Sequence, residues 1–294
     1  MRTKSAFALA PIFALSAFIS ISCSTSPAAT RSSATGKAEL AISDEAYVAL
    51  GVSKTKVDAW EDGMRTSGER GSYEWWYFDS TLSDGSTLVI VFSTKNQLQP
   101  DGPLAPRLSF ELTRPDGRAL VRELIVPVKD FSASKEGCDV RMGDNRFSGD
   151  LEDSAIRIDM KDLKADIRLH GTVPAWRPAS GYITFKGKDE HYFAWLPSVP
   201  QGLVEGRIAI EGRSETVSGV GYHDHNWGDA SLLGLLHDWY WGRAQIGGYS
   251  VIASYMTATD AYGNSTQPIF MLARDGKLVA EDSTKVKCLA KDLY

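Results

Sequence analysis

The chain has 294 residues, of which 43% are hydrophobic and 23% are charged, and its formal net charge is −5. This composition is typical of a folded globular protein and not of a disordered one. The negative net charge offers no basic surface for phosphate groups, so we expect no nucleic-acid partner.

The N-terminus has the layout of a secretory signal. Arg2 and Lys4 precede an apolar run from Ala6 to Ile21 that ends in small residues. We therefore predict a signal peptide over residues 1–22 and export of the protein to the periplasm or cell envelope. Cys23 follows directly, which makes it a candidate for lipid attachment and so for a membrane tether. Ordinary signal cleavage is the alternative.

Residues 23–55 are predicted to form a tether and a short N-terminal segment. The first part is rich in Ser, Thr and Ala, as expected of a solvated linker, and a short helix is expected near residues 44–50. Beyond this segment, the remaining cysteines are Cys138 and Cys288. They could form one disulfide in an oxidising compartment, or they could be two separate buried side chains.

From residue 73 onward the pattern is persistently that of β-strands. Gly-containing turn signals at residues 83–86 and 114–117 separate short apolar runs, since glycine supplies the positive φ that tight turns require. Short strands without intervening helical patterns indicate an antiparallel sandwich or barrel. The expected strands are 73–81, 86–94, 107–113, 119–128, 141–148, 155–160, 165–172, 182–185, 191–197, 202–210 and 215–222.

A leucine-rich stretch at residues 229–241 interrupts this pattern. It fits one side of a short helix or a broad turn, at a convenient boundary between two β-domains. Roughly five more strands follow, fewer than the roughly eight that close a ligand-sized barrel. We therefore expect an all-β protein in which residues 56–223 form an antiparallel barrel domain and residues 224–294 an incomplete second β-domain.

The block Tyr73–Asp79 is unusually aromatic. In a strand its odd-numbered residues share one face and its even-numbered residues share the other, so both faces carry large rings. This is typical of a buried central strand. Glu74 is the exception, because a buried carboxylate needs a partner or an altered pKa.

The block Gly221–Asp229 holds two of the five histidines, two aspartates and a tryptophan. Such a density of titratable groups indicates either a functional site or a rigid polar corner. For His223 and Asp224, a satisfied polar network at the domain junction is as good an interpretation as a direct catalytic role.

Metal binding by His223 and His225 is a further alternative. Their i, i+2 spacing puts both imidazoles on one strand face, and His237, Asp224 or Asp229 could complete a site. A His-x-His pair without a wider ligand pattern is nevertheless a weak signal. We therefore expect neither a metal nor a cofactor.

Three ordered blocks resemble those of a known family. Residues 74–79, 221–228 and 238–243 are similar to the signature blocks of the carotenoid 1,2-hydratase (hydroxyneurosporene synthase) superfamily. That superfamily includes lipocalin-like proteins of attachment operons and is similar to fungal Diels–Alderases that form decalins. The resemblance covers roughly residues 60–260. It implies two lipocalin-like β-barrel domains, and we expect the second to be incomplete in this chain.

The resemblance also implies a hydrophobic ligand, such as an isoprenoid, polyketide or lipid, that is hydrated, isomerised or cyclised in an aromatic-lined cavity. The third block of the hydratases is followed by a tyrosine and then an aspartate two residues later. The nearest match here is Tyr255, with Asp260 three residues beyond Thr257. The alternative is a non-catalytic lipid-binding accessory protein of the envelope. The expected catalytic residues are His225, Asp224, Glu74 and Tyr255, and the expected substrate-binding residues are Trp75, Trp76, Tyr77, Tyr222, Asn226, Trp227, Trp239, Trp241 and Arg243.

Overall fold

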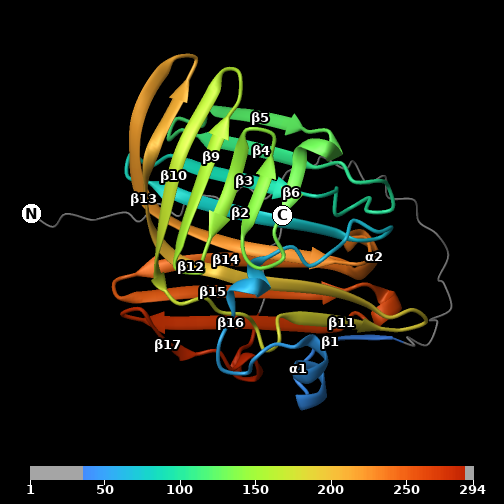
Figure 1. Cartoon of the computed structure of the whole chain (residues 1–294). Helices are drawn as coiled ribbons and strands as arrows, with labels where there is room; N and C mark the ends of the chain where they lie inside the picture. The colour runs from blue at the N-terminus through green and yellow to red at the C-terminus, as the bar shows by residue number, and fades with distance from the viewer. Residues whose placement is uncertain (1–35, 289–294) are drawn as a thin grey trace, which may run out of the picture. The chain divides into compact units, whose positions relative to one another are not determined.

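The computed structural model describes residues 36–288, which fold mainly into antiparallel strands (Figure 1). The predicted signal peptide and the candidate lipidation site Cys23 lie outside the described residues. From one edge to the other, the main strands of the larger sheet are β5 (Ala119–Ile125), β4 (Arg107–Thr113), β3 (Thr87–Ser93), β2 (Tyr73–Leu82), β13 (Arg213–Gly228), β12 (His191–Ile210), β10 (Leu163–Val173), β9 (Asp153–Asp159), β8 (Asn145–Gly149), β7 (Asp139–Met142) and β6 (Phe131–Ala133). Two short strands extend it, since β11 (Tyr182–Lys186) pairs with β12, and β1 (Lys37–Leu40) pairs with β11.

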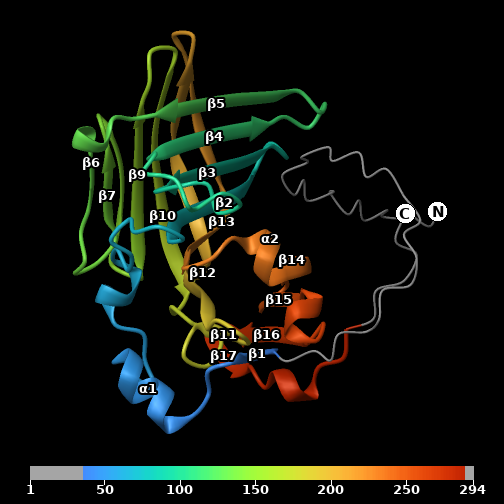
Figure 2. The ribbon, with the colours of Figure 1, turned by 90° about the vertical axis from the view of Figure 1, so that its right-hand side faces the viewer.

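A smaller sheet follows in the order β14 (Leu236–Ile246), β15 (Tyr249–Ala258), β16 (Thr266–Arg274) and β17 (Lys277–Ala280). It lies on the β2 side of the larger sheet, away from β5 (Figures 1 and 2). The helical elements are short: α1 (Asp44–Leu50), α2 (Leu232–Leu235) and the 3-10 turns η1 (Ala59–Asp62), η2 (Val128–Asp130), η3 (Asp260–Tyr262) and η4 (Ser283–Lys285). Within residues 36–288, none of the helices has the length and apolar character needed to cross a bilayer.

The larger sheet curls so that its two halves share one interior. Side chains from β2–β4 and from β7–β10 belong to the same buried apolar cluster. The rings of Phe92 on β3 and Phe147 on β8, for example, are 5.8 Å apart. This curled antiparallel sheet confirms the predicted all-β, lipocalin-like fold.

A second core joins the larger sheet to the smaller one. Tyr73, Trp75 and Tyr222 from the larger sheet are buried together with Ile252 and Met256 from the smaller sheet. The odd-numbered residues of block 73–79 therefore face the smaller sheet, while Trp76 and Phe78 face the curled interior. This is the division of faces that strand alternation predicts.

The expected helix at residues 44–50 is confirmed as α1. The hydroxyl of Ser43 accepts a hydrogen bond from the backbone N–H of Ala46 at 3.2 Å, and Gly51 ends the helix with φ of 70°. These are the usual start and stop signals of a helix. The helix expected within residues 229–241 is shorter, because only Leu232–Leu235 is helical and β14 already begins at Leu236.

Two further expectations concern the boundary and the cysteines. The boundary expected between residues 223 and 224 falls inside β13, which pairs with β2 without interruption from Gly219 to Gly228. The smaller sheet begins only at Leu236. Cys138 and Cys288 are both free, with Cys138 buried and Cys288 exposed, so the structure contains no disulfide between them.

Close contact of β13 with β2 leads to a stability prediction. A Cβ atom on Gly219 would lie 2.2 Å from the carbonyl oxygen of Thr81 and 2.8 Å from the Cα of Leu82. Both atoms are backbone, so the strands would have to shift, and we expect Gly219→Ala to lower the free energy of unfolding by about 1–3 kcal/mol. Urea unfolding measures this loss. Gly242→Ala on β14 is the matched control, since a Cβ there meets nothing within 4 Å, and an equal loss in both variants would contradict the prediction.

Candidate functional site

The pairing of β2 with β13 brings the two sequence blocks side by side. Asn226 lies opposite Trp75, His225 opposite Trp76 and Asp224 opposite Tyr77. Because successive side chains of a strand point to opposite faces, the paired strands carry one polar group on each face. One group faces the smaller sheet and the other faces the curled interior.

The group that faces the smaller sheet is centred on Asp224, which is 7% exposed. Its Oδ2 accepts hydrogen bonds from the Tyr222 hydroxyl at 2.7 Å and from the indole Nε1 of Trp195 at 2.8 Å. Its Oδ1 accepts a hydrogen bond from the amide Nδ2 of Asn226 at 2.6 Å. Three donors thus fix this carboxyl group, and we call Tyr222, Asp224, Asn226 and Trp195 the Asp224 cluster.

Burial also alters the acidity of this cluster. Burial raises the pKa of Asp224 to about 6, although the hydrogen bonds from Tyr222 and Trp195 act in the opposite direction. Burial likewise raises the pKa of the Tyr222 phenol well above 10. The phenol therefore keeps its proton and donates a hydrogen bond to the carboxylate.

Arg243 on β14 links the smaller sheet to this face. Its Nε donates to Asp79 Oδ1 at 2.9 Å, and its Nη1 is 3.4 Å from Gln201 Oε1. Its guanidinium carbon also lies 5.7 Å from the centre of the Tyr222 ring. Arginine suits this position because its planar guanidinium can pair with a carboxylate and stack on an aromatic ring at the same time.

Trp241 forms an aromatic wall over the cluster. Its ring centre is 5.3 Å from that of Tyr222 and 6.4 Å from that of Tyr77. Considering residues 36–288, the buried Trp241 Nε1, Ser254 Oγ and Asn226 Oδ1 have no hydrogen-bond partner. Buried polar atoms are normally paired, so these three atoms lack the partner expected of them.

The group on the opposite face of β13 is centred on Glu74, which is fully buried. Its carboxylate accepts hydrogen bonds from the backbone N–H groups of Arg65 and Thr66, from the Thr66 hydroxyl and from His225 Nε2 at 2.7 Å. His225 also stacks on Trp76, with ring centres 4.6 Å apart. Every oxygen of Glu74 is thus used in holding the segment after η1 against β2 and β13.

His223 lies on the same side and contacts η1. Its Nε2 is 3.1 Å from Asp62 Oδ2, and its Nδ1 is 2.9 Å from the backbone oxygen of Tyr77. Glu61, the neighbour of Asp62, lies 3.3 Å from Arg177 Nε. Buried charges are therefore paired across the contact between η1 and the larger sheet.

The structure separates residues that the sequence placed in one cavity. Asp224, Tyr222, Asn226, Trp75, Tyr77, Trp241 and Arg243 share the side of the larger sheet that meets the smaller one. His225, Glu74 and Trp76 lie on the other side of the β2–β13 pair, so they cannot act on the same bound molecule as Asp224. The single shared cavity expected for all of them is therefore not what the structure shows.

Three other expected residues lie apart from the Asp224 cluster. Trp227 Nε1 donates to the Tyr182 hydroxyl at 3.0 Å in a separate small core. Trp239 is 40% exposed and contacts Phe193. Tyr255 alternates with the buried Ser254 and Met256 on β15, so it faces away from the larger sheet. Tyr255 is therefore not positioned to act with Asp224.

The ligand set considered for a metal is not brought together either. His237 is exposed and its Nδ1 is 2.8 Å from Asp238 Oδ2, whereas Asp229 accepts from the backbone N–H of Tyr192. The sequence analysis did not predict Trp195 and Asp62 as partners of the block Gly221–Asp229. Nothing in the sequence marks Trp195 except its place in an apolar strand. Asp62 could have been noticed, because two adjacent acids, Glu61 and Asp62, follow Trp60.

A curled antiparallel sheet packed on a second sheet, with a buried carboxyl group among aromatic rings between them, defines a lipocalin-like β-protein. Residues 43–294 match the family model described as Diels-Alderase-like, and the chain belongs to this family. The resemblance inferred from the three sequence blocks is thereby confirmed.

Curated relatives of the chain carry several different names. It is 25% identical over 203 residues to the quinolone epoxide rearrangement protein asqO of Emericella nidulans, covering 62% of this chain and 53% of the relative. It is 28% identical over 206 residues to hydroxyneurosporene dehydrogenase of Chlorobaculum tepidum, covering 59% and 53%. It is 24% identical to the Diels-Alderase cheD of Chaetomium globosum, covering 64% and 47%. The chain spans about half the length of these relatives.

Solved structures show the same fold. A crystal structure of a protein described as AttH from Nitrosomonas europaea matches with a TM-score of 0.54 and 20% identity, covering 73% of this chain and 69% of that one. The crystal structure of CghA with Sch210972 matches with a TM-score of 0.54 and 16% identity, covering 77% and 68%. The lipocalin-like fold predicted from the sequence is therefore shared with both.

Proposed function

We propose that the chain binds a hydrophobic small molecule against the Asp224 cluster and catalyses its cyclisation or rearrangement without a cofactor. The observation that carries this proposal is a buried carboxyl group held by three donors within an aromatic face. Beside it stand polar atoms, such as Trp241 Nε1, that have no partner in the described part of the chain. Aromatic surface binds an apolar ligand, and a few placed polar groups fix its orientation.

Cyclisation and rearrangement suit this geometry because they need little chemistry from the protein. A folded substrate must be held in a reactive conformation, and hydrogen-bond donors must polarise it. Trp241 Nε1 can supply such a donor, and Asn226 Oδ1 can accept a hydrogen bond from a polar group of the substrate. Hydration is less favoured, because Tyr255, the expected partner in protonating an alkene, faces away from the cluster.

The relatives support a catalytic role over a purely binding one. Two of them are named for quinolone epoxide rearrangement and for a Diels–Alder reaction, and both names describe reactions that reorganise bonds within a carbon skeleton. We infer the same class of reaction here, on a substrate that is hydrophobic but carries at least one polar group.

The test is a comparison of substrate loss and product formation. Purified protein is incubated with an apolar extract of its host, and the extract is followed by mass spectrometry. We expect at least one compound to be replaced by an isomer of the same mass, which heat-denatured protein does not produce. Recovery of a bound compound without conversion would support the non-catalytic lipid-binding alternative and contradict catalysis.

We also propose that the protein is exported, with Cys23 as a candidate lipid tether. This proposal is supported by Arg2 and Lys4 ahead of the apolar run that ends at Ile21. The mass of the mature protein from its host tests it. A mass that still includes residues 1–22 would contradict export, and a diacylglyceryl mass increase on Cys23 would show the tether.

A further inference from the structure

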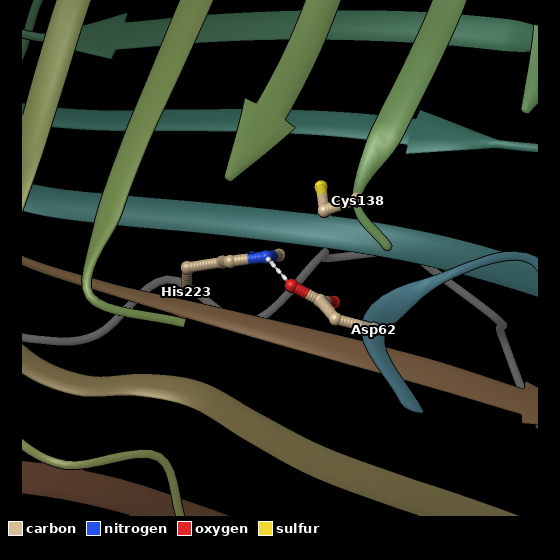
Figure 3. A group of neighbouring side chains, drawn as sticks. All are labelled: Asp62, Cys138 and His223. Atoms are coloured by element: carbon tan, nitrogen blue, oxygen red, sulfur yellow. Dashed lines mark hydrogen bonds and ion pairs between the residues drawn. The ribbon is translucent and has the colours of Figure 1, made fainter. Parts of the chain in front are cut away.

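Three side chains of metal-binding type converge inside the larger sheet. Asp62 is the last residue of η1, Cys138 directly precedes β7 and His223 lies in β13 (Figure 3). Their exposed fractions are 1%, 3% and 0%. One carboxylate oxygen, the sulfur and one imidazole nitrogen all lie within 4.8 Å of one another. They come from three distant parts of the sequence, so only the fold assembles them.

The orientation of His223 suits a metal ligand. Its Nδ1 lies 2.9 Å from the backbone oxygen of Tyr77, which can only accept, so this nitrogen carries the hydrogen. The lone pair of a neutral ring is then on Nε2, which faces Asp62 Oδ2 at 3.1 Å. Metal-binding histidines commonly donate their other N–H to a backbone carbonyl in this way. Because Nε2 and the carboxylate are then both acceptors, either a second proton on the ring or a metal ion must lie between them.

A proton on Nε2 would not satisfy the whole group. Within the described residues, Asp62 Oδ1 has no hydrogen-bond partner. His225 Nδ1 is 3.7 Å from this oxygen, beyond hydrogen-bond distance. The Cys138 thiol donates a long hydrogen bond to the backbone oxygen of Phe147, at 4.0 Å. A proton therefore leaves one buried oxygen of Asp62 without a partner and the thiol with a single long hydrogen bond, although buried polar atoms are normally well paired.

The neighbouring pair of His225 and Glu74 serves as an internal comparison. There both carboxylate oxygens are occupied by backbone and hydroxyl donors of the segment after η1, and His225 Nδ1 lies 3.3 Å from the backbone oxygen of Glu61. Protons satisfy that group completely. The group around Asp62 differs, because Asp62 Oδ1 has no hydrogen-bond partner within the described residues.

We propose that Asp62, Cys138 and His223 form a buried structural site for a divalent cation of the borderline type, with Zn²⁺ as the favoured ion. A mixed sulfur, nitrogen and oxygen set suits Zn²⁺, whereas Ca²⁺ and Mg²⁺ prefer oxygen ligands alone. On binding, the Cys138 thiol loses its proton to solvent, and the thiolate and carboxylate together neutralise the ion. The ion would link η1 to β7 and β13 inside the curled larger sheet. This inference departs from our expectation of no metal and does not depend on the proposed function.

The first test measures the metal content of the purified full chain expressed with added Zn²⁺. We expect stoichiometric zinc in the wild type and its loss in Cys138→Ser and Asp62→Asn. Cys288→Ser is the matched control, because Cys288 is the exposed cysteine and should leave the zinc content unchanged. Wild-type protein without zinc, or equal zinc in the Cys138 and Cys288 variants, would overturn the proposal.

A second test uses only the wild type, in case the variants fail to fold. The chain is unfolded with a chelator and refolded with Co²⁺, which gives a thiolate charge-transfer band in the near ultraviolet when sulfur is a ligand. We expect this band, together with a higher melting temperature after refolding with Zn²⁺ than with the chelator. Absence of both would show that His223 and Asp62 share only a proton.

Discussion

Replacement of Asp224 by asparagine is expected to lower product formation by about 100-fold or more, the loss typical when a preorganised polar group of a catalytic site is removed. The variant exchanges one acceptor oxygen for an N–H₂ donor. The amide can still accept from Tyr222 and Trp195 on one side, but on the other side it meets the Nδ2 of Asn226. Asn226 must then rotate its amide, which reorients the polar groups that face the ligand.

The fold of the Asp224 variant should be retained, because the new side chain has the same shape and Asn226 can supply an acceptor after rotation. We therefore expect a melting temperature close to that of the wild type and a ligand still bound. Asp166→Asn, an exposed change on β10, is the control and should preserve both activity and stability. If Asp224→Asn forms product at the wild-type rate, the proposed site is wrong. If the substitution only unfolds the protein, the Asp224 cluster is a polar network that stabilises the fold and has no catalytic role.

Glu74→Ala is expected to lower the free energy of unfolding by about 3–5 kcal/mol, because several buried donors lose the carboxylate that accepts from them. The carboxylate accepts four hydrogen bonds, two of them from backbone groups of Arg65 and Thr66. Its loss leaves these donors and His225 buried without an acceptor. Urea unfolding followed by circular dichroism measures the change.

Glu123→Ala is the matched control for Glu74. Glu123 pairs with Arg107 at 2.6 Å, but its side chain is 49% exposed. Surface pairs contribute little, so we expect a loss of about 1 kcal/mol or less. A similar loss in both variants would contradict the structural role of Glu74. If Glu74→Ala keeps its stability but loses product, the catalytic role predicted from the sequence applies instead.

Much of the fold could be predicted from the sequence, because strand alternation and turn chemistry are local. The division of block 73–79 into two faces is an example, since it follows from the backbone geometry of a single strand. The capped helix α1 is another, since Ser43 and Gly51 act within a few residues. The extent of α2 was not predictable to the same degree, because β14 pairs with β15 already from Leu236 and so ends the helix early.

The candidate site was predictable only in part. Its residue types were visible in the two dense blocks, but the sequence could not say which of them share a space. Asp224 and His225 are adjacent, yet they lie on opposite faces of β13, and each acquires partners from a different region. Trp195 and Asp62 became visible as partners only through strand pairing and the docking of η1.

The sequence alone thus determined the all-β class, the family and the two polar and aromatic blocks, because these depend on residue type and short-range spacing. Tertiary structure alone decided that Asp224 faces the smaller sheet, that Glu74 holds the segment after η1, and that Cys138 lies beside His223. The physical reason is the register of β2 on β13 and the curl of the larger sheet. Both are set by the packing of residues far apart in the chain, which no local pattern encodes.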